Sequence, residues 1–196
     1  MLASFIVFTS CQKPTPVKTI ENLKAGITGE TTASAKYAAF AAKAVEEGYD
    51  TIARLFLAAS KSESIHAANH LKVLEELGVK MDPVTPEFEV STTALNLQAA
   101  IEGEGYEVAT MYPEFIATAK EEKVKKAVKS YTWAVDTEKK HQEFYKAALA
   151  SLNNNTEKDL AYEFLICPTC GNTYAKGNVD DKCAFCRTDS GEYIAI

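Results

Sequence analysis

Two short motifs place a carboxylate and an imidazole on the same face of a helix. Glu63 precedes His66 by three residues, and Glu138 precedes His141 by the same interval. Residues at this spacing are neighbours on an α-helix, so each motif directs two ligand atoms toward one point. Carboxylate oxygens with two imidazoles suit iron or manganese better than copper or structural zinc. The two motifs therefore predict a metal site between two helices.

One glutamate on each of two further segments completes the predicted site. Glu30 and Glu104 interrupt the apolar stripes of their segments at about the height of the two Glu-x-x-His motifs. For any single glutamate an exposed position is the simpler interpretation. Burying the whole set without counter-charge would be costly, however, and two metal ions offset most of that cost. One Glu from each of two helices, with Glu-x-x-His from the other two, is the ligand pattern of carboxylate-bridged di-iron bundles.

Four of the five cysteines form two C-x-x-C pairs near the C-terminus. Twelve residues separate the pair Cys167 and Cys170 from the pair Cys183 and Cys186. A disulfide scaffold would spread its cysteines through the chain, whereas this spacing predicts a closed site of four thiolates. Zinc and iron both accept such a site, and zinc is the commoner occupant. Iron, as a one-electron carrier, fits better beside a di-iron site that consumes electrons.

The helices that position the first site appear as apolar residues at three- and four-residue spacing. Asp50 is expected to cap the second helix and Gly78 to end it. Pro113 should bend the third helix. We expect four amphipathic helices, at residues 19–47, 51–77, 92–120 and 122–152.

The lengths of the connections predict the topology. Short turns make two antiparallel hairpins, and residues 79–91 can stretch the length of the bundle between them. This is the all-α, ferritin-like four-helix bundle with one long crossover. The expected division is a leader at 1–17, the bundle at 18–152, a linker at 153–164 and a small cysteine domain at 165–196.

Composition indicates an ordered globular protein. The chain has 196 residues, 46% of them hydrophobic, which supports one substantial core with a small appendage. The formal net charge is −6 and the lysines are scattered along the helices, so nucleic acid is not an expected partner. No apolar run reaches the ~18–20 residues that span a bilayer.

The first residues allow two interpretations. An apolar run at residues 2–8 is followed by Cys11, as at the end of a bacterial lipoprotein signal in which that cysteine carries the lipid. The positive segment that usually begins such a signal is missing. The alternative is an apolar leader on a cytoplasmic protein. Lipidation of Cys11 would be the protein's only expected link to a membrane.

Taken together, the motifs resemble the rubrerythrin family from about Lys18 to Ile196. A plain ferritin or a bare rubredoxin would match only one part of the chain. The matching residues are Gly29 and Glu30 with Tyr37, Glu63 with His66 and Ala67, Gly103 and Glu104 with Glu107, Met111 to Pro113, Glu138 with His141, and the two cysteine pairs.

The resemblance implies a bacterial, cytoplasmic non-haem iron peroxidase that reduces hydrogen peroxide to water under oxidative stress. It implies that Glu107 is an extra carboxylate, which exchanges with His66 as a ligand of one iron when the redox state changes. Tyr37 and Tyr112 match tyrosines beside the metals and, with Glu107, are the candidate catalytic residues. The implied di-iron ligands are Glu30, Glu63, His66, Glu104, Glu107, Glu138 and His141.

The resemblance also implies a rubredoxin-like iron site at the four cysteines, which relays electrons from a redox protein or reductase. Members pair head to tail, so the cysteine domain of one chain can serve the bundle of another. This sequence departs from the family at Asn172, where an aromatic residue is usual, and in lacking a proline in the second cysteine pair. His70 matches no ligand position and is expected in the core or beside the ligands.

Two other functions stay open from the residues alone. The chain could be a ferroxidase or iron-handling bundle with a structural zinc ribbon. It could also be a redox sensor whose cysteine domain moves with oxidation state. Neither accounts for Glu107 as well as the peroxidase does.

Overall fold

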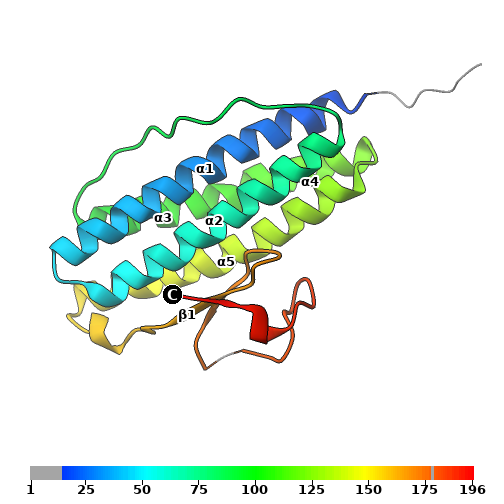
Figure 1. Cartoon of the computed structure of the whole chain (residues 1–196). Helices are drawn as coiled ribbons and strands as arrows, with labels where there is room; N and C mark the ends of the chain where they lie inside the picture. Colours follow the sequence, from blue (N-terminus) through cyan, green and yellow to red (C-terminus); the bar gives the residue numbers. More distant parts are fainter. Residues whose placement is uncertain (1–14, 178) are drawn as a thin grey trace, which may run out of the picture.

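An elongated helical bundle forms most of the molecule (Figure 1). The computed structural model describes residues 15–177 and 179–196, so Cys11 and most of the leader lie outside the described residues. A π-helical segment, η1 (Glu107–Met111), lies between the third and fourth α-helices. The α-helices are α1 (Val17–Glu46), α2 (Asp50–Glu76), α3 (Thr93–Tyr106), α4 (Tyr112–Glu121) and α5 (Lys125–Asn153).

Helices α1 and α2 form the first antiparallel hairpin. Gly48 in their turn has φ +85°, and Gly78 follows α2 with φ +78°, a conformation that favours glycine. The predicted end of the second helix at Gly78 is thus confirmed, but the predicted cap is wrong. Asp50 is the first helical residue, and Tyr49 before it makes no side-chain capping hydrogen bond. The Asp50 carboxylate instead favours the first turn through the helix dipole.

The predicted single helix over residues 92–120 is also wrong in detail, because η1 interrupts it. Thr92 caps α3 by accepting a hydrogen bond from Leu95 N at 3.4 Å. The N–H of Tyr112 donates to Glu107 O, a five-residue step that widens the helix at this point. Pro113 is the second residue of α4, where its missing N–H leaves no helical hydrogen bond unmade. Together α3, η1 and α4 form one arm that packs against α5.

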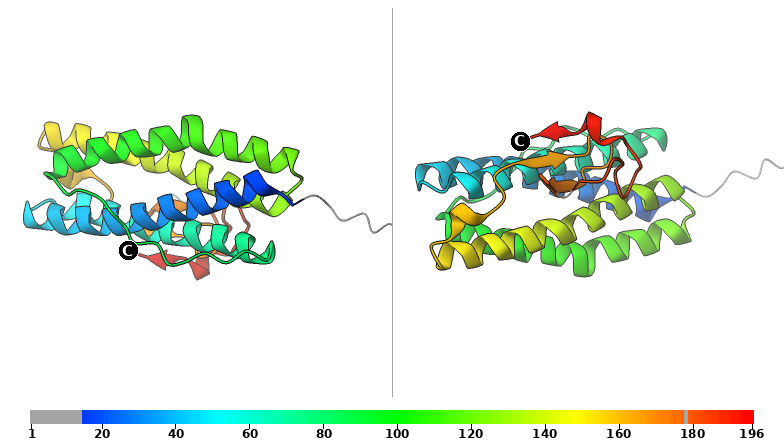
Figure 2. Two further views of the ribbon diagram at one scale, coloured as in Figure 1. Left: turned by 90° about the horizontal axis from the view of Figure 1, so that it is seen from above. Right: turned by 90° about the horizontal axis from the view of Figure 1, so that it is seen from below.

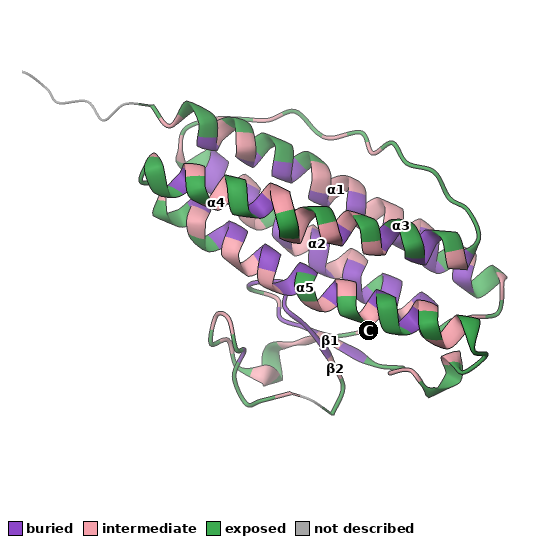
Figure 3. Ribbon diagram, turned by 180° about the vertical axis from the view of Figure 1, so that it is seen from behind, coloured by how far each residue is buried: buried purple, intermediate pink, exposed green. Residues whose placement is uncertain are grey.

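The core is split into two apolar clusters along the bundle. One contains Phe40, Phe56 and Tyr145. The other contains Leu23 and Tyr131, with further residues of α2 and α4. The predicted ligands Glu30, Glu63, His66, Glu104, Glu138 and His141 lie between the two clusters along α1, α2, α3 and α5. Buried positions recur along the α-helices (Figure 3), and these six residues are among them, so they occupy a layer inside the bundle.

The crossover from α2 to α3 runs the length of the bundle on its outer side, as predicted (Figure 2). After α5 and the short helix η2 (Glu157–Asp159), three strands form an antiparallel sheet of order β2-β1-β3. The sheet region contacts α2 and α5 on the other side of the bundle. Its strands are β1 (Phe164–Ile166), β2 (Thr173–Ala175) and β3 (Ile194–Ala195), and a short helix, η3 (Ser190–Glu192), precedes β3.

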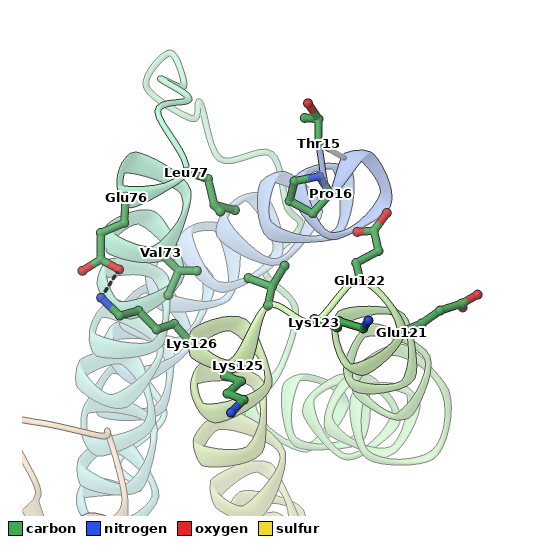
Figure 4. Close-up of a pocket in the computed structure, with 11 residues that line it drawn as sticks. Thr15, Pro16, Val73, Glu76, Leu77, Glu121, Glu122, Lys123, Lys125 and Lys126 are labelled. Carbon is green, nitrogen blue, oxygen red and sulfur yellow. Dashed lines mark hydrogen bonds and ion pairs between the residues drawn. The ribbon is translucent and has the colours of Figure 1, made fainter. Parts of the chain in front are cut away.

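One hollow lies at an end of the bundle, away from the predicted metal ligands. It has a volume of about 1160 Å³, between the start of α1, the end of α2 and the turn from α4 to α5 (Figure 4). The ion pair of Lys126 Nζ with Glu76 Oε2, at 2.7 Å, borders it. None of the predicted metal ligands lines it. No helix within the described ranges is long and apolar enough to cross a membrane.

Candidate metal centres

The predicted carboxylates and imidazoles meet in one buried layer. Glu30 comes from α1, Glu104 from α3, and the two Glu-x-x-His motifs come from α2 and α5. All six side chains are at most 2% exposed. Four carboxylates at this depth require positive charge close by, because an unpaired buried charge is strongly unfavourable.

The layer contains two groups of potential ligand atoms, each small enough to surround one metal ion. Within each group the atoms lie within 4.8 Å of one another. Glu63 and Glu138 belong to both groups, so these two carboxylates are placed to bridge a pair of ions. The first group is Glu30, Glu63, His66 and Glu138, and the second is Glu63, Glu104, Glu138 and His141.

The two imidazoles face the shared carboxylates symmetrically. His66 Nδ1 lies 2.9 Å from Glu63 and 2.8 Å from Glu138. His141 Nδ1 lies 3.1 Å from Glu63 and 2.8 Å from Glu138. Each ring therefore turns the same nitrogen toward the centre of the layer.

Apart from these ion-pair contacts with the imidazoles, several of the buried atoms have no hydrogen-bond partner, which is rare in folded proteins. They include one oxygen each of Glu30 and Glu63, both oxygens of Glu138, and His141 Nδ1. All belong to the two groups of ligand atoms. Carboxylate oxygens and a neutral imidazole nitrogen with unused lone pairs are the donors that iron or manganese binds. The residues present thus fit a two-metal centre.

Contacts outside the layer orient His141. Its Nε2 lies 2.9 Å from Thr173 Oγ1, and that hydroxyl donates to Gly171 O at 3.3 Å. A hydroxyl has one proton to donate, so the imidazole N–H is the donor to Thr173. In a metal-bound form the proton would therefore stay on Nε2, and Nδ1 would offer its lone pair to the metal ion.

Glu107 lies at the margin of the layer. It belongs to neither compact group of ligand atoms and is half-buried in the π-helical segment η1. Burial, together with the charges of Glu138 and Glu63, raises the pKa of its carboxyl well above the usual value, although His66 and Lys36 oppose this. The sequence could not show that Glu107 starts a widened helical turn.

The two predicted tyrosines hydrogen-bond to carboxylates of the layer. Tyr37 OH donates to Glu104 Oε1 at 2.7 Å, and Tyr112 OH donates to Glu30 Oε1. His70 is buried, as predicted, with Nε2 3.1 Å from Tyr112 OH and Nδ1 2.7 Å from Ser130 Oγ. Burial and the charge of His66 lower the pKa of His70 to about 3, so this imidazole is neutral.

In the metal-free protein, bound protons on the imidazoles and carboxyl groups of the layer neutralise part of its negative charge. Burial opposes charge on His66 and His141, but the neighbouring glutamates outweigh it and raise the two pKa values to about 10 and about 9. Burial also opposes charge on Glu63, yet His141 and His66 lower its pKa to about 2. Burial and neighbouring carboxylates raise the pKa values of Glu30 and Glu104.

The four cysteines form a second, separate centre. Cys167 Sγ lies 3.4 Å from Cys186 Sγ, and Cys170 Sγ lies 3.5 Å from Cys183 Sγ, too far for disulfides. The two C-x-x-C turns match, because Gly171 N donates to Cys167 O and Arg187 N donates to Cys183 O, both at 3.0 Å. All four Sγ atoms lie within 4.8 Å of one another, which fits a tetrahedral metal ion.

The segment after Cys170 joins the two centres. Gly171 O accepts a hydrogen bond from Ser62 Oγ of α2 at 2.6 Å, and Thr173 bonds His141 of α5 as described. Gly171 has φ +83°, and an added Cβ would overlap the imidazole of His66. Sequence patterns gave no signal for this contact, because it depends on how the sheet region packs against α2 and α5.

Comparison with known proteins agrees with this geometry. A sequence model described as Rubrerythrin matches residues 21–149. The chain belongs to the rubrerythrin family. Nigerythrin of Nitratidesulfovibrio vulgaris is 40% identical over 86% of this chain and 81% of its own length. Rubrerythrin-2 of Clostridium acetobutylicum is 33% identical over 91% of this chain and 96% of its own.

A solved structure extends the likeness to the whole chain. The fully reduced, all-ferrous state of nigerythrin superposes with a TM-score of 0.83 and 36% identity, over 96% of this chain and 89% of that one. The ferritin-like fold and the four-cysteine centre predicted from the sequence are therefore confirmed. So is the family.

Removing the metal should make stability depend on pH in a defined direction. Below pH 6.5 the raised pKa values of His66 and His141 contribute fully to the stability of the metal-free protein. That contribution is lost as the pH rises through about 9 and about 10. Raised pKa values at Glu30 and Glu104 act in the same direction, because their folded forms bind more protons than the unfolded chain.

We therefore predict that the free energy of unfolding of the metal-free protein falls between pH 6.5 and pH 9, while the metal-loaded protein changes less. Urea unfolding of both forms at the two pH values measures this. A metal-free form that is equally stable at both would contradict the charge balance described above.

A side chain at position 171 should displace the imidazole of His66. This effect comes in addition to the free-energy cost of placing a non-glycine residue at positive φ. Gly171→Ala and Gly48→Ala both place a side chain at nearly the same positive φ, at a cost of about 1–2 kcal/mol. A Cβ added at Gly48 would meet no atom of the described residues within 4 Å beyond its chain neighbours, so Gly48 is the matched control. We expect only Gly171→Ala to weaken metal retention in the bundle, measured by chelator-induced release. Equal release from both variants would show that this contact does not hold His66.

Proposed function

We propose that this chain is a di-iron peroxidase that reduces hydrogen peroxide to water, with electrons supplied through an iron ion at the four cysteines. The observation that carries the proposal is the hydrogen-bonded junction between the two centres. Ser62 and His141, from the two helices that carry the Glu-x-x-His motifs, both bond to the segment that directly follows Cys170. A site that must be re-reduced in every cycle benefits from such a connection to an electron carrier.

The proposed ligands divide by position. Glu63 and Glu138 would be shared by the two ions, because they belong to both groups of ligand atoms. His66 with Glu30, and His141 with Glu104, would complete the two groups, and Glu107 at the margin would be an additional ligand. The proposed di-iron ligands are Glu30, Glu63, His66, Glu104, Glu107, Glu138 and His141, and the proposed ligands of the third iron are Cys167, Cys170, Cys183 and Cys186.

Reducing hydrogen peroxide to two waters takes two electrons and two protons, and a pair of ferrous ions bound in the layer supplies the electrons. The chain's own residues handle the protons. The carboxyl of Glu107 lies between the layer and solvent, where it can hold a proton for the departing oxygen. Tyr112 and Tyr37 fix the terminal carboxylates Glu30 and Glu104 by donating hydrogen bonds to them. The two apolar clusters exclude bulk water from both sides.

The electrons come from outside the chain. We propose a redox protein or reductase as donor to the four-cysteine iron. We also propose a head-to-tail homodimer or a higher homo-oligomer, as the family resemblance implies. In the structure the cysteine region contacts the bundle of its own chain, so the junction is complete without a second copy.

Comparing two oxidants tests the proposed reaction against an iron-handling function. The chemically reduced, iron-loaded full chain is mixed with hydrogen peroxide or with dissolved oxygen at the same concentration. We predict that the visible absorption of the oxidised centres returns several-fold faster with peroxide. Faster return with oxygen would favour a ferroxidase and contradict the peroxidase.

Removing one cysteine tests the electron relay. Cys170→Ser should leave a single peroxide turnover in a pre-reduced bundle but abolish steady turnover, because re-reduction needs the four-cysteine iron. Cys11→Ser is the control, since Cys11 belongs to neither C-x-x-C pair. Peroxide consumption is measured with a reductase and its electron source. An unchanged steady rate in Cys170→Ser would rule out the relay. Negligible turnover by the unmodified chain would favour a sensor.

A further inference from the structure

Lys140 extends from the bundle toward the four-cysteine centre. It directly precedes His141 on α5 and is half-buried against the sheet region. Its Nζ donates to Asn172 Oδ1 at 2.6 Å and to Thr173 O at 3.4 Å. It also lies 4.3 Å from the ring centroid of Tyr174 and 5.0 Å from that of Phe185. Oxygen acceptors and aromatic faces are the surroundings that suit an ammonium group.

No carboxylate of the described residues pairs with Lys140, in contrast to its neighbour. Lys139 is exposed and pairs with Asp136, Nζ to Oδ1 at 2.7 Å. The positive charge of Lys140 is thus not cancelled within the part of the chain that the structure describes. It is available to the negatively charged thiolates of the other centre.

Asn172 connects Lys140 to the sulfur atoms. While its Oδ1 accepts from Lys140, its Nδ2 donates to Tyr174 OH at 2.7 Å and approaches Cys183 Sγ at 3.7 Å. Tyr174 OH in turn donates toward Cys183 Sγ at 3.5 Å. Asn172 and Cys183 are fully buried. The result is a chain of polar groups from the ammonium of α5 to a metal-binding thiolate.

We propose that Lys140, acting through Asn172, raises the reduction potential of the four-cysteine iron and couples that potential to the docking of the cysteine region on α5. When the ferric site takes up one electron without a proton, four thiolates and the metal gain one negative charge. A nearby positive charge and hydrogen bonds to sulfur stabilise that more negative state. Because Lys140 belongs to the bundle, the stabilisation exists only while the two parts are in contact.

The coupling must work in both directions. If docking raises the potential, reduction must tighten docking by the same factor, since the two equilibria share one thermodynamic cycle. Reduction of the four-cysteine iron would therefore shift the docking equilibrium toward the state in which segment 171–175 contacts α5 and the imidazoles. Lys140 is thus a positioning and tuning residue, which touches neither the two-metal layer nor a cysteine.

A redox titration of the iron-loaded full chain tests this, with Lys139→Met as the matched control for Lys140→Met. The readout is the thiolate-to-iron absorption in the presence of redox mediators. We expect Lys140→Met to shift the oxidised-to-reduced equilibrium about tenfold toward the oxidised form, a drop of about 59 mV for one electron. Lys139→Met should leave the potential unchanged, because that lysine is exposed and already paired.

Hydrogen exchange reports on the docking half of the proposal. Reduction should increase amide protection in residues 171–175 of the unmodified chain, and this increase should be absent in Lys140→Met. If that variant loses its thiolate-to-iron absorption, Lys140→Gln keeps a hydrogen-bond donor without the charge and gives the same comparison.

Three results would contradict the proposal or part of it. An unchanged potential in the charge-removing variant, or the same drop in Lys139→Met, would overturn the proposal. Protection of residues 171–175 that does not depend on redox state would overturn the coupling. The test uses no peroxide, so absence of peroxidase activity would defeat the proposed function and leave this comparison intact.

Discussion

Four carboxylates are buried inside the helical bundle, and burying negative charge is unfavourable unless positive charge lies close by. The arrangement of the surrounding ligands is explained by this one constraint. The apolar clusters on both sides exclude water from the layer, which raises the cost of an unpaired charge there. The two imidazoles can neutralise only part of this negative charge, because together they carry at most two positive charges. Two divalent cations, held by the two shared carboxylates, would balance the four negative charges completely. The symmetry of Glu63 and Glu138 about the two histidines is the geometric sign of that solution.

The second constraint is that the metal layer and the four-cysteine centre share a boundary. Residues 171–173 cover the imidazole edges that point away from the shared carboxylates, with Gly171 against His66 and Thr173 against His141. The same three residues begin next to Cys170 and include Asn172, which links Lys140 to the sulfur atoms. Residues 171–173 therefore orient the predicted ligands, and the proposed electron supply and redox tuning would depend on the same short segment. A change there should affect both centres.

Much of this could be predicted from the sequence, for identifiable reasons. Glu63 with His66 and Glu138 with His141 have helical spacing, so their convergence needed no knowledge of the fold. The thirteen residues between the hairpins fixed the crossover by length alone. The π-helical turn at Glu107 was not predictable, because one extra residue in a turn hardly changes the apolar pattern. The Asp50 cap failed because the helix starts one residue earlier than a cap would require. The contacts of Gly171 and Lys140 depend on packing across a linker, which no local pattern encodes.

The most direct test of the central claim is a metal count on the purified full chain, combined with its visible and Mössbauer spectra. The structure provides two groups of ligand atoms that share carboxylates, and one four-cysteine group. The account predicts about three irons per chain, two of them magnetically coupled in oxygen and nitrogen ligation and one bound by sulfur. A bundle that binds no metal, or a single uncoupled ion, while its carboxylates stay buried would contradict it.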